Sequence, residues 1–195
     1  RLDKLVDEQF YSSLGANRTT YLPLRKFDKS VIVPSEKDDY YRNQLVHGYV
    51  HDMGAAMLGG VGGHAGLFAN ANDIAKIMQL YLQEGFYGGK QYLKPETIEK
   101  FNKRYYADKK VRRGLGFDKP QLNPDVKATC GCVSDKSFGH SGFTGTYTWA
   151  DPATDIVYVF LSNRTYPSMN NKKLIKSNMR TKIQEDIQNA ILMSE

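Results

Sequence analysis

Residues 139–149 read GHSGFTGTYTW, and after one alanine the chain continues through DPATD into the run IVYVFLSN. From Phe143 onward, aromatic residues alternate with threonines, a period of two that is typical of a β-strand. The later run is rich in β-branched and aromatic residues, and the proline between the two stretches occupies the second position of a turn. The sequence therefore predicts that residues 140–149 and 155–163 pair as antiparallel strands.

A helical pattern follows this hairpin. Apolar residues recur at a spacing of four toward the end of the chain, at Ile175, Met179, Ile183, Ile187 and Ile191. The spacing predicts a helix over residues 170–193 whose apolar stripe packs on the sheet. An antiparallel sheet with packed helices is an α+β fold. We divide the chain into a loop and helix region at 1–136, a sheet hairpin at 137–166 and the C-terminal helix at 170–193.

The first 136 residues predict short helices joined by long irregular segments. The expected elements are a helix that Gly15 ends, an irregular excursion over 16–60, a helix from Asn70 or Asn72 to Gly85, a helix opened by Lys94 and Pro95, and a short strand at 114–118. Loops as long as the one at 16–60 are usually functional in a compact domain.

Charge and composition exclude some classes of protein. The 195 residues carry a formal net charge of +6, with 41% hydrophobic and 25% charged residues, as is ordinary for a globular domain. No stretch approaches the roughly 18 apolar residues of a membrane helix. The basic residues of the last helix lack the interleaved aromatics of a nucleic-acid site, which favours a solvated helix face and no nucleic-acid partner. The N-terminus is charged and has no initiating Met, so we expect a truncated or processed chain without a signal peptide.

Cys130 and Cys132 are separated by one glycine. A disulfide that closes a single residue is strained, and two sulfurs do not make a zinc site. We therefore expect two free thiols in a turn.

Three short motifs match known signatures only in their letters. Residues 60–65 fit a dinucleotide fingerprint, but no clear strand precedes them and the helix starts too late. His47 and His51 have the spacing of a zinc-binding pair, but a glycine replaces the glutamate base. Residues 139–142 begin like a nucleophile elbow, but Phe143 stands where that motif needs glycine.

The segment from His140 to Thr146 resembles the third motif of the serine β-lactamase and penicillin-binding-protein superfamily. In its class C-like β-lactamase, esterase and D-alanyl-D-alanine carboxypeptidase branch, His-Ser-Gly or His-Thr-Gly replaces Lys-Thr-Gly. Residues 50–75 are similar to the loop-to-helix element that borders the site in this branch. The segments 94–97 and 114–117 then follow in the family's order. The resemblance implies a β-lactamase/transpeptidase-like fold, incomplete in this chain.

The resemblance also implies roles for individual residues. His140 and Ser141 would orient the carbonyl or carboxylate of the substrate, and Phe143 would donate its backbone N–H to the oxyanion hole. The residues that would contact the substrate are Gly142, Thr144, His64, His51 and Asp52. We expect His51 and Asp52 to pair with each other and brace the glycine-rich loop.

The family's nucleophile lies in Ser-x-x-Lys, and no serine of this sequence has a lysine three residues on. Tyr41-Arg42-Asn43 has the letters of the second motif but stands downstream of its place. The resemblance therefore implies the C-terminal half of a serine hydrolase domain that acts through an acyl-enzyme, inactive on its own.

Partners and setting are likewise implied by the resemblance. The partners would be the missing N-terminal half and a peptidoglycan-like, β-lactam or ester substrate, with self-association through uncovered surface. The setting would be periplasmic or secreted, and no metal or organic cofactor is implied. The alternatives are a non-catalytic binding or scaffold module of a multidomain cell-envelope protein, and an unrelated α+β domain.

Overall fold

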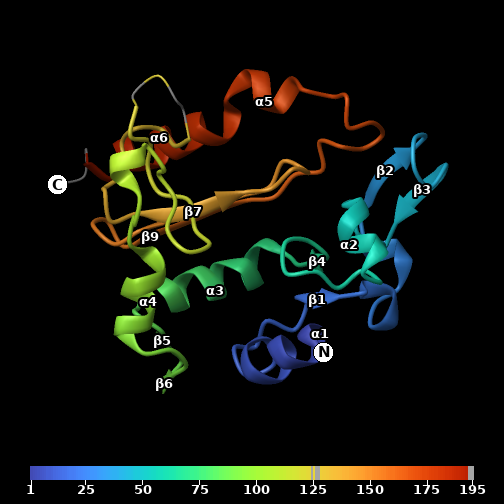
Figure 1. Cartoon of the computed structure of the whole chain (residues 1–195), viewed down its shortest axis with the longest axis horizontal. Helices are drawn as coiled ribbons and strands as arrows, with labels where there is room; N and C mark the ends of the chain where they lie inside the picture. Colours follow the sequence, from blue (N-terminus) through green and yellow to red (C-terminus); the bar gives the residue numbers. More distant parts are fainter. Residues whose placement is uncertain (124, 126–127, 193–195) are drawn as a thin grey trace. The chain divides into compact units, whose positions relative to one another are not determined.

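The computed structural model describes the whole chain except residues 124, 126–127 and 193–195 (Figure 1). The chain forms two compact units, each of which draws on separate parts of the sequence. Unit 1 comprises Arg1–Lys76, Gly142–Thr146 and Leu161–Leu174. Unit 2 comprises Ile77–Ser141, Tyr147–Phe160 and the chain from Ile175 onward. Mixed helices and small antiparallel sheets confirm the expected α+β class.

Unit 2 is built on a three-stranded antiparallel sheet in the order β7-β8-β9, of which β7 and β9 are labelled in Figure 1. The strands are β7 (Phe138–Ser141), β8 (Tyr147–Asp151) and β9 (Ile156–Phe160). The predicted antiparallel pairing across the proline turn is confirmed, with Trp149 opposite Tyr158. The predicted single strand at 140–149 is wrong, because residues 142–146 form a turn and β7 pairs with β8. Gly145, at φ +101°, allows the chain to reverse there.

The core of unit 2 lies between this sheet and the last helix. Tyr147, Trp149 and Tyr158 are buried together, and Ile183 and Ile187 of α6 (Met179–Leu192) pack against them. Packing of the C-terminal helix on the sheet is therefore confirmed. Alternating aromatic residues form one face of the sheet, and the four-residue spacing on α6 provides the matching stripe.

The predicted helix at 170–193 is not continuous. The structure has α5 (Lys173–Ser177) and α6, separated by Asn178 at φ +51°. Ile175 and Met179, expected on the packing stripe, are exposed. Asn178 interrupts the helix, so the apolar stripe does not continue from α5 into α6. Residue 193 lies outside the described residues.

The remaining helices agree with their expected signals. Helix α3 (Ala71–Leu82) ends where expected, with the N–H of Gly85 bonded to the carbonyl of Leu80. Helix α4 (Pro95–Asn102) begins at the proline after Lys94. The strands β5 (Phe86–Tyr87) and β6 (Lys90–Gln91) pair between these helices, and η4 (Ala107–Lys109) follows. The strand expected at 114–118 is reduced to one bridge between Asp118 and Gly139.

Unit 1 contains short elements from the first part of the chain. They are α1 (Leu2–Val6), η1 (Asp7–Tyr11), β1 (Thr20–Tyr21), η2 (Pro23–Arg25), η3 (Lys29–Val31), β2 (Pro34–Asp38), β3 (Gln44–His47), α2 (Met53–Met57) and β4 (Leu67–Phe68). Strand β1 pairs with β4, and β2 pairs with β3, both antiparallel. The expectation of an irregular excursion over 16–60 is therefore wrong for the β2–β3 hairpin. Hydrophobic periodicity missed it because β2 buries Ser35, Glu36 and Asp38 instead of apolar residues.

The expectation of free thiols is also wrong, since Cys130 and Cys132 form a disulfide. Gly131 between them adopts φ +82°, and the two Cα atoms lie 5.3 Å apart. The left-handed glycine folds the two flanking residues toward each other. Within the described residues, no helix is long and apolar enough to span a membrane.

Candidate active site

His140 and Ser141 end strand β7, and both are exposed. Nδ1 of His140 lies 2.8 Å from the carbonyl oxygen of Ser141, and Nε2 lies 3.2 Å from Nη1 of Arg113. A guanidinium can only donate hydrogen bonds, so Nε2 is the acceptor. This arrangement favours the tautomer that carries its proton on Nδ1 and donates to the Ser141 carbonyl.

Arg113 is held in place by a nearly buried carboxylate. Its Nε lies 2.9 Å from Asp118, which also pairs with Arg112 at 2.9 Å. The backbone of Asp118 exchanges two hydrogen bonds with Gly139, the residue before His140. Asp118 thus connects the guanidinium of Arg113 to strand β7, which carries His140. We did not predict Arg113 from the sequence, where its one signal is its place directly before Gly-Leu-Gly-Phe.

Residues 142–146 form a tight turn after β7. The N–H of Gly142 donates to Thr146 at 2.8 Å, and the N–H of Gly145 donates to Gly142 at 3.0 Å. A Cβ on Gly142 would collide with Oγ1 of Thr146. Phe143 is 61% exposed, and within the described residues its backbone N–H meets no hydrogen-bond acceptor. That N–H can therefore donate to a bound molecule.

Two side chains of unit 1 flank the ring of Phe143. The imidazole of His51 lies 5.4 Å from it, measured between ring centroids. The guanidinium carbon of Arg164 lies 4.5 Å from the ring centroid. Distances of this size are typical of aromatic and cation–π contacts. His51 and Phe143, both singled out from the sequence, are thereby brought together.

The expected pairing of His51 with Asp52 is wrong. Nε2 of His51 lies 2.9 Å from Oε2 of Glu36, on strand β2. Neighbouring residues in an extended segment point in different directions, so His51 and Asp52 reach different partners. Glu36 is only 1% exposed. A charged residue in a polar strand carries no sequence signal of burial, which is why Glu36 was missed.

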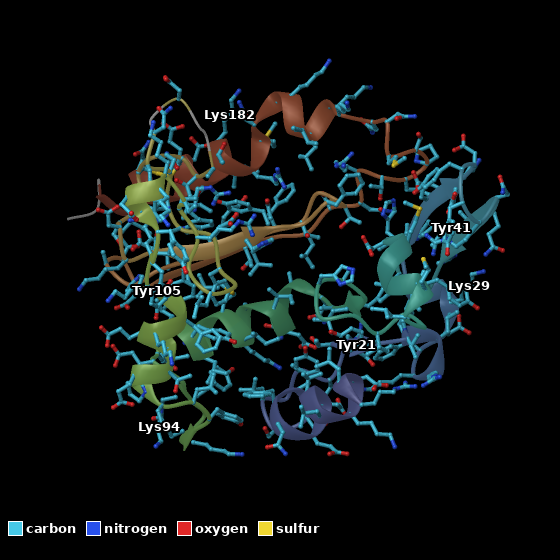
Figure 2. The ribbon with its side chains drawn as sticks, viewed as in Figure 1. Tyr21, Lys29, Tyr41, Lys94, Tyr105 and Lys182 are labelled. Carbon is cyan, nitrogen blue, oxygen red and sulfur yellow. A yellow bond between two sulfur atoms is a disulfide. The ribbon has the colours of Figure 1, made fainter. Side chains whose placement is uncertain are left out.

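Asp52 has two partners of its own. Its Oδ1 accepts the N–H of Ala55 at 2.7 Å, as the N-cap of α2, and lies 3.0 Å from Nε2 of His64. The Ala55 N–H, followed by the His64 imidazole, holds the pKa of Asp52 below its usual range. The glycine-rich loop is tied by Tyr21, labelled in Figure 2, whose hydroxyl donates to the carbonyl of Gly62 at 3.0 Å.

The site residues expected from the sequence are found in both units. In unit 1 lie Gly142, Phe143 and Thr144 of the turn, with His51, Asp52 and His64. In unit 2 lie His140 and Ser141, with Arg113 beside them. No group of three or more His, Cys, Asp or Glu side chains within the described residues could hold a metal ion.

Comparison with known proteins gives a consistent result. The Beta-lactamase family model matches residues 1–178. A protein of Escherichia coli K12 assigned as a D-alanyl-D-alanine carboxypeptidase is 36% identical in an alignment of 178 residues that covers 85% of this chain and 40% of that protein. A protein of Salmonella agona with the same assignment is 34% identical over 186 residues, covering 89% of this chain and 42% of that protein. The chain thus spans about two fifths of the length of these relatives.

Solved structures support the same fold. A β-lactamase from Mycobacterium bovis superposes with a TM-score of 0.61 at 16% identity, covering 97% of this chain and 56% of that one. A penicillin-binding-protein homologue from Caulobacter crescentus gives 0.55 at 18% identity, covering 83% and 46%. The order of motifs, the fold and the family-model match over residues 1–178 all indicate the same family. The chain belongs to the β-lactamase family, within the serine β-lactamase and penicillin-binding-protein superfamily.

Proposed function

We propose that this chain supplies one wall of the active site of a serine hydrolase that acts through an acyl-enzyme. Its substrate is an amide, ester or β-lactam of the kind that D-Ala-D-Ala carboxypeptidases, β-lactamases and esterases use. The serine nucleophile, its lysine and the tyrosine motif come from residues outside this sequence. The relatives, of which the chain covers about two fifths, have room for them.

One observation carries the proposal. The N–H of Phe143 follows the exposed pair His140 and Ser141, and it meets no acceptor within the described residues. In acyl transfer the carbonyl oxygen gains negative charge in the transition state, and an N–H already aimed at it lowers the barrier. Removing one such donor typically costs about 10²–10³-fold in rate.

The other residues of the site have roles around this donor. His140 and Ser141 orient the carbonyl or carboxylate of the substrate, with Arg113 fixing the imidazole. Gly142, which has no side chain, lets the substrate approach the backbone. Thr144, in the same turn, contacts the substrate. His51, Asp52 and His64 also contact the substrate in this proposal. The proposed setting is the periplasm or the cell exterior, close to peptidoglycan.

Labelling tests the proposal. The full-length protein that contains this chain is incubated with a fluorescent penicillin and with a fluorophosphonate, and the adduct is mapped by mass spectrometry. We expect one acyl adduct on a serine outside residues 1–195. An adduct on a serine of this chain would contradict the proposal. An intact, folded protein that neither probe labels would favour a non-catalytic binding or scaffold module instead.

A further inference from the structure

Unit 1 contains a buried carboxylate that has several partners. Oε1 of Glu36 accepts the backbone N–H of Met169 at 2.8 Å, and Oε2 accepts the hydroxyl of Tyr40 at 2.9 Å. Nε2 of His51 lies 2.9 Å from Oε2 as well. A buried charge is costly unless it is paired and hydrogen-bonded. Glu36 therefore fixes the segment around Met169 by a hydrogen bond and lies in close contact with the ring of His51, whose Nε2 makes no hydrogen bond within the described residues.

The backbone of Met169 links Glu36 to Arg164 through two hydrogen bonds. Its N–H donates to Glu36, and its carbonyl accepts Nη1 of Arg164 at 2.9 Å. The same Nη1 reaches the carbonyl of Asn171 at 3.0 Å. Arg164 is only 8% exposed. These bonds leave the guanidinium little freedom to move.

Two contacts lead from Glu36 to Phe143. His51, which lies beside Glu36, contacts the Phe143 ring, and so does Arg164, which is linked to Glu36 through Met169. The backbone N–H of Arg164 also donates to the carbonyl of Thr144, the next residue of the turn, at 3.0 Å. Contacts therefore run in a closed circuit through Glu36, Met169, Arg164, Phe143 and His51. The circuit joins four separate stretches of the sequence.

We infer that His51 and Arg164 are positioning residues, which hold the ring of Phe143 and thereby aim its backbone N–H at the substrate, with Glu36 anchoring both. This inference rests on the proposed function. The ring of Phe143 does not pack in a core. Its contacts with His51 and Arg164 hold the turn at 142–146 in place. A displacement of about 1 Å in a reacting group can cost about 10²-fold in rate.

Two variants separate this role from a general effect on folding. Phe143→Ala removes the exposed ring but leaves the N–H in the chain. His51→Gln keeps an N–H donor near Glu36 but removes the imidazole ring. In the full-length protein, we expect each to lower kcat by about 10- to 100-fold, with KM within about threefold, because the N–H acts on the transition state.

The double variant is the decisive measurement. If both residues act through one contact, Phe143→Ala combined with His51→Gln should be no more than about threefold slower than the worse single variant. Hydrogen exchange of the peptide over 142–146 should be faster in His51→Gln. Matched controls are His47→Gln, whose imidazole contacts the carbonyl of Ile32, and Phe86→Ala, an exposed phenylalanine of β5. Both controls should keep kcat within about threefold.

The possible results are distinguishable. A wild-type protein that no substrate or probe acylates contradicts the proposed function itself. If the wild type is active, the positioning role alone is contradicted by either of two results. One is a single variant that keeps kcat within threefold of the wild type, and the other is a double variant whose loss in kcat is the product of the two single losses.

Discussion

Gly142 is a residue whose backbone must come close to its neighbours. A Cβ there would collide with Oγ1 of Thr146. We expect Gly142→Ala to lower the free energy of unfolding by about 1–3 kcal/mol through overpacking, and to slow acylation by moving Phe143. Thermal unfolding checks the first effect. The double variant Gly142→Ala, Thr146→Ala removes the colliding atom, so it should recover most of the stability. A double variant as unstable as the single one would contradict the steric explanation.

Lys119 is a nearly buried lysine of unit 2. Its Nζ donates to Asn102 at 3.0 Å and to the carbonyl of Lys136 at 2.8 Å. Burial, with the nearby charge of Arg104, lowers the pKa of Lys119 to about 8. The unfolded chain keeps this proton up to the ordinary pKa of 10.5, so unfolding takes up a proton between these two values.

The stability of the wild type relative to Lys119→Met should therefore rise as pH increases from about 8 to about 10.5. Below about pH 8 the cost of burying the charge is fully present, and the difference should be constant. Urea unfolding of both proteins at pH 7 and pH 10 measures the two differences. An identical difference at both pH values would show that Lys119 titrates normally in the folded protein.

Among the elements, the β2–β3 hairpin of unit 1 holds the segment that carries His51. Asp38, at the end of β2, is buried. Its carboxylate accepts the N–H groups of Tyr40, Tyr41 and Arg42 and the guanidinium of Arg42. The same guanidinium donates to the carbonyls of Val50 and His51, both at 2.7 Å. The turn of the hairpin thus fixes the backbone that carries His51.

This hairpin should weaken in acid. Burial alone would raise the pKa of Asp38, but the N–H of Tyr41, the guanidinium of Arg42 and the other N–H groups lower it to about 2. Because the folded pKa is below the unfolded one, the stabilisation is present above about pH 4 and is lost as pH falls toward 2. Asp38→Asn should therefore cost most stability at neutral pH, and the gap to the wild type should narrow between pH 4 and pH 2. A constant gap in chemical denaturation across this range would contradict the prediction.

For the whole molecule, the missing Ser-x-x-Lys leads to a direct expectation about activity. We predict that residues 1–195 alone hydrolyse neither nitrocefin nor a p-nitrophenyl ester above background. Without a nucleophile, binding and oxyanion contacts leave at best about 10³–10⁴-fold over water. If the proposed function is right, adding the nucleophile-bearing part of the full-length protein in trans should restore turnover. Stoichiometric acylation of the chain alone would contradict this prediction.

Exposed apolar surface leads to a second expectation at this scale. Several large apolar side chains of unit 1 are more than half exposed, among them Val31, Val33, Met57 and Leu58. Burying one such side chain is worth roughly 1.5–3 kcal/mol. We expect residues 1–195 to self-associate, or to bind the N-terminal part of the protein. Light scattering over a range of concentrations measures the first and titration with that part the second. A monodisperse monomer that binds nothing would contradict the expectation.

The sequence by itself determined the elements whose signals are local. The sequence predicted the antiparallel pairing across the proline turn, the packing of Ile183 and Ile187 of α6, the proline that opens α4 and the order of the family motifs. The structure and the comparisons confirm the fold and the family. These signals depend on which face of one element is buried, and a single stretch of sequence carries that information.

Tertiary structure alone decided the rest. Glu36 is buried where Met169, distant in sequence, donates to it, and His51 contacts Glu36 instead of its neighbour Asp52. Arg113 meets His140 only because the backbone of Asp118 pairs with that of Gly139. A charged side chain can be buried only where partners from other segments pair with it. The local sequence of a polar strand does not show whether those partners are present, so it cannot predict the burial.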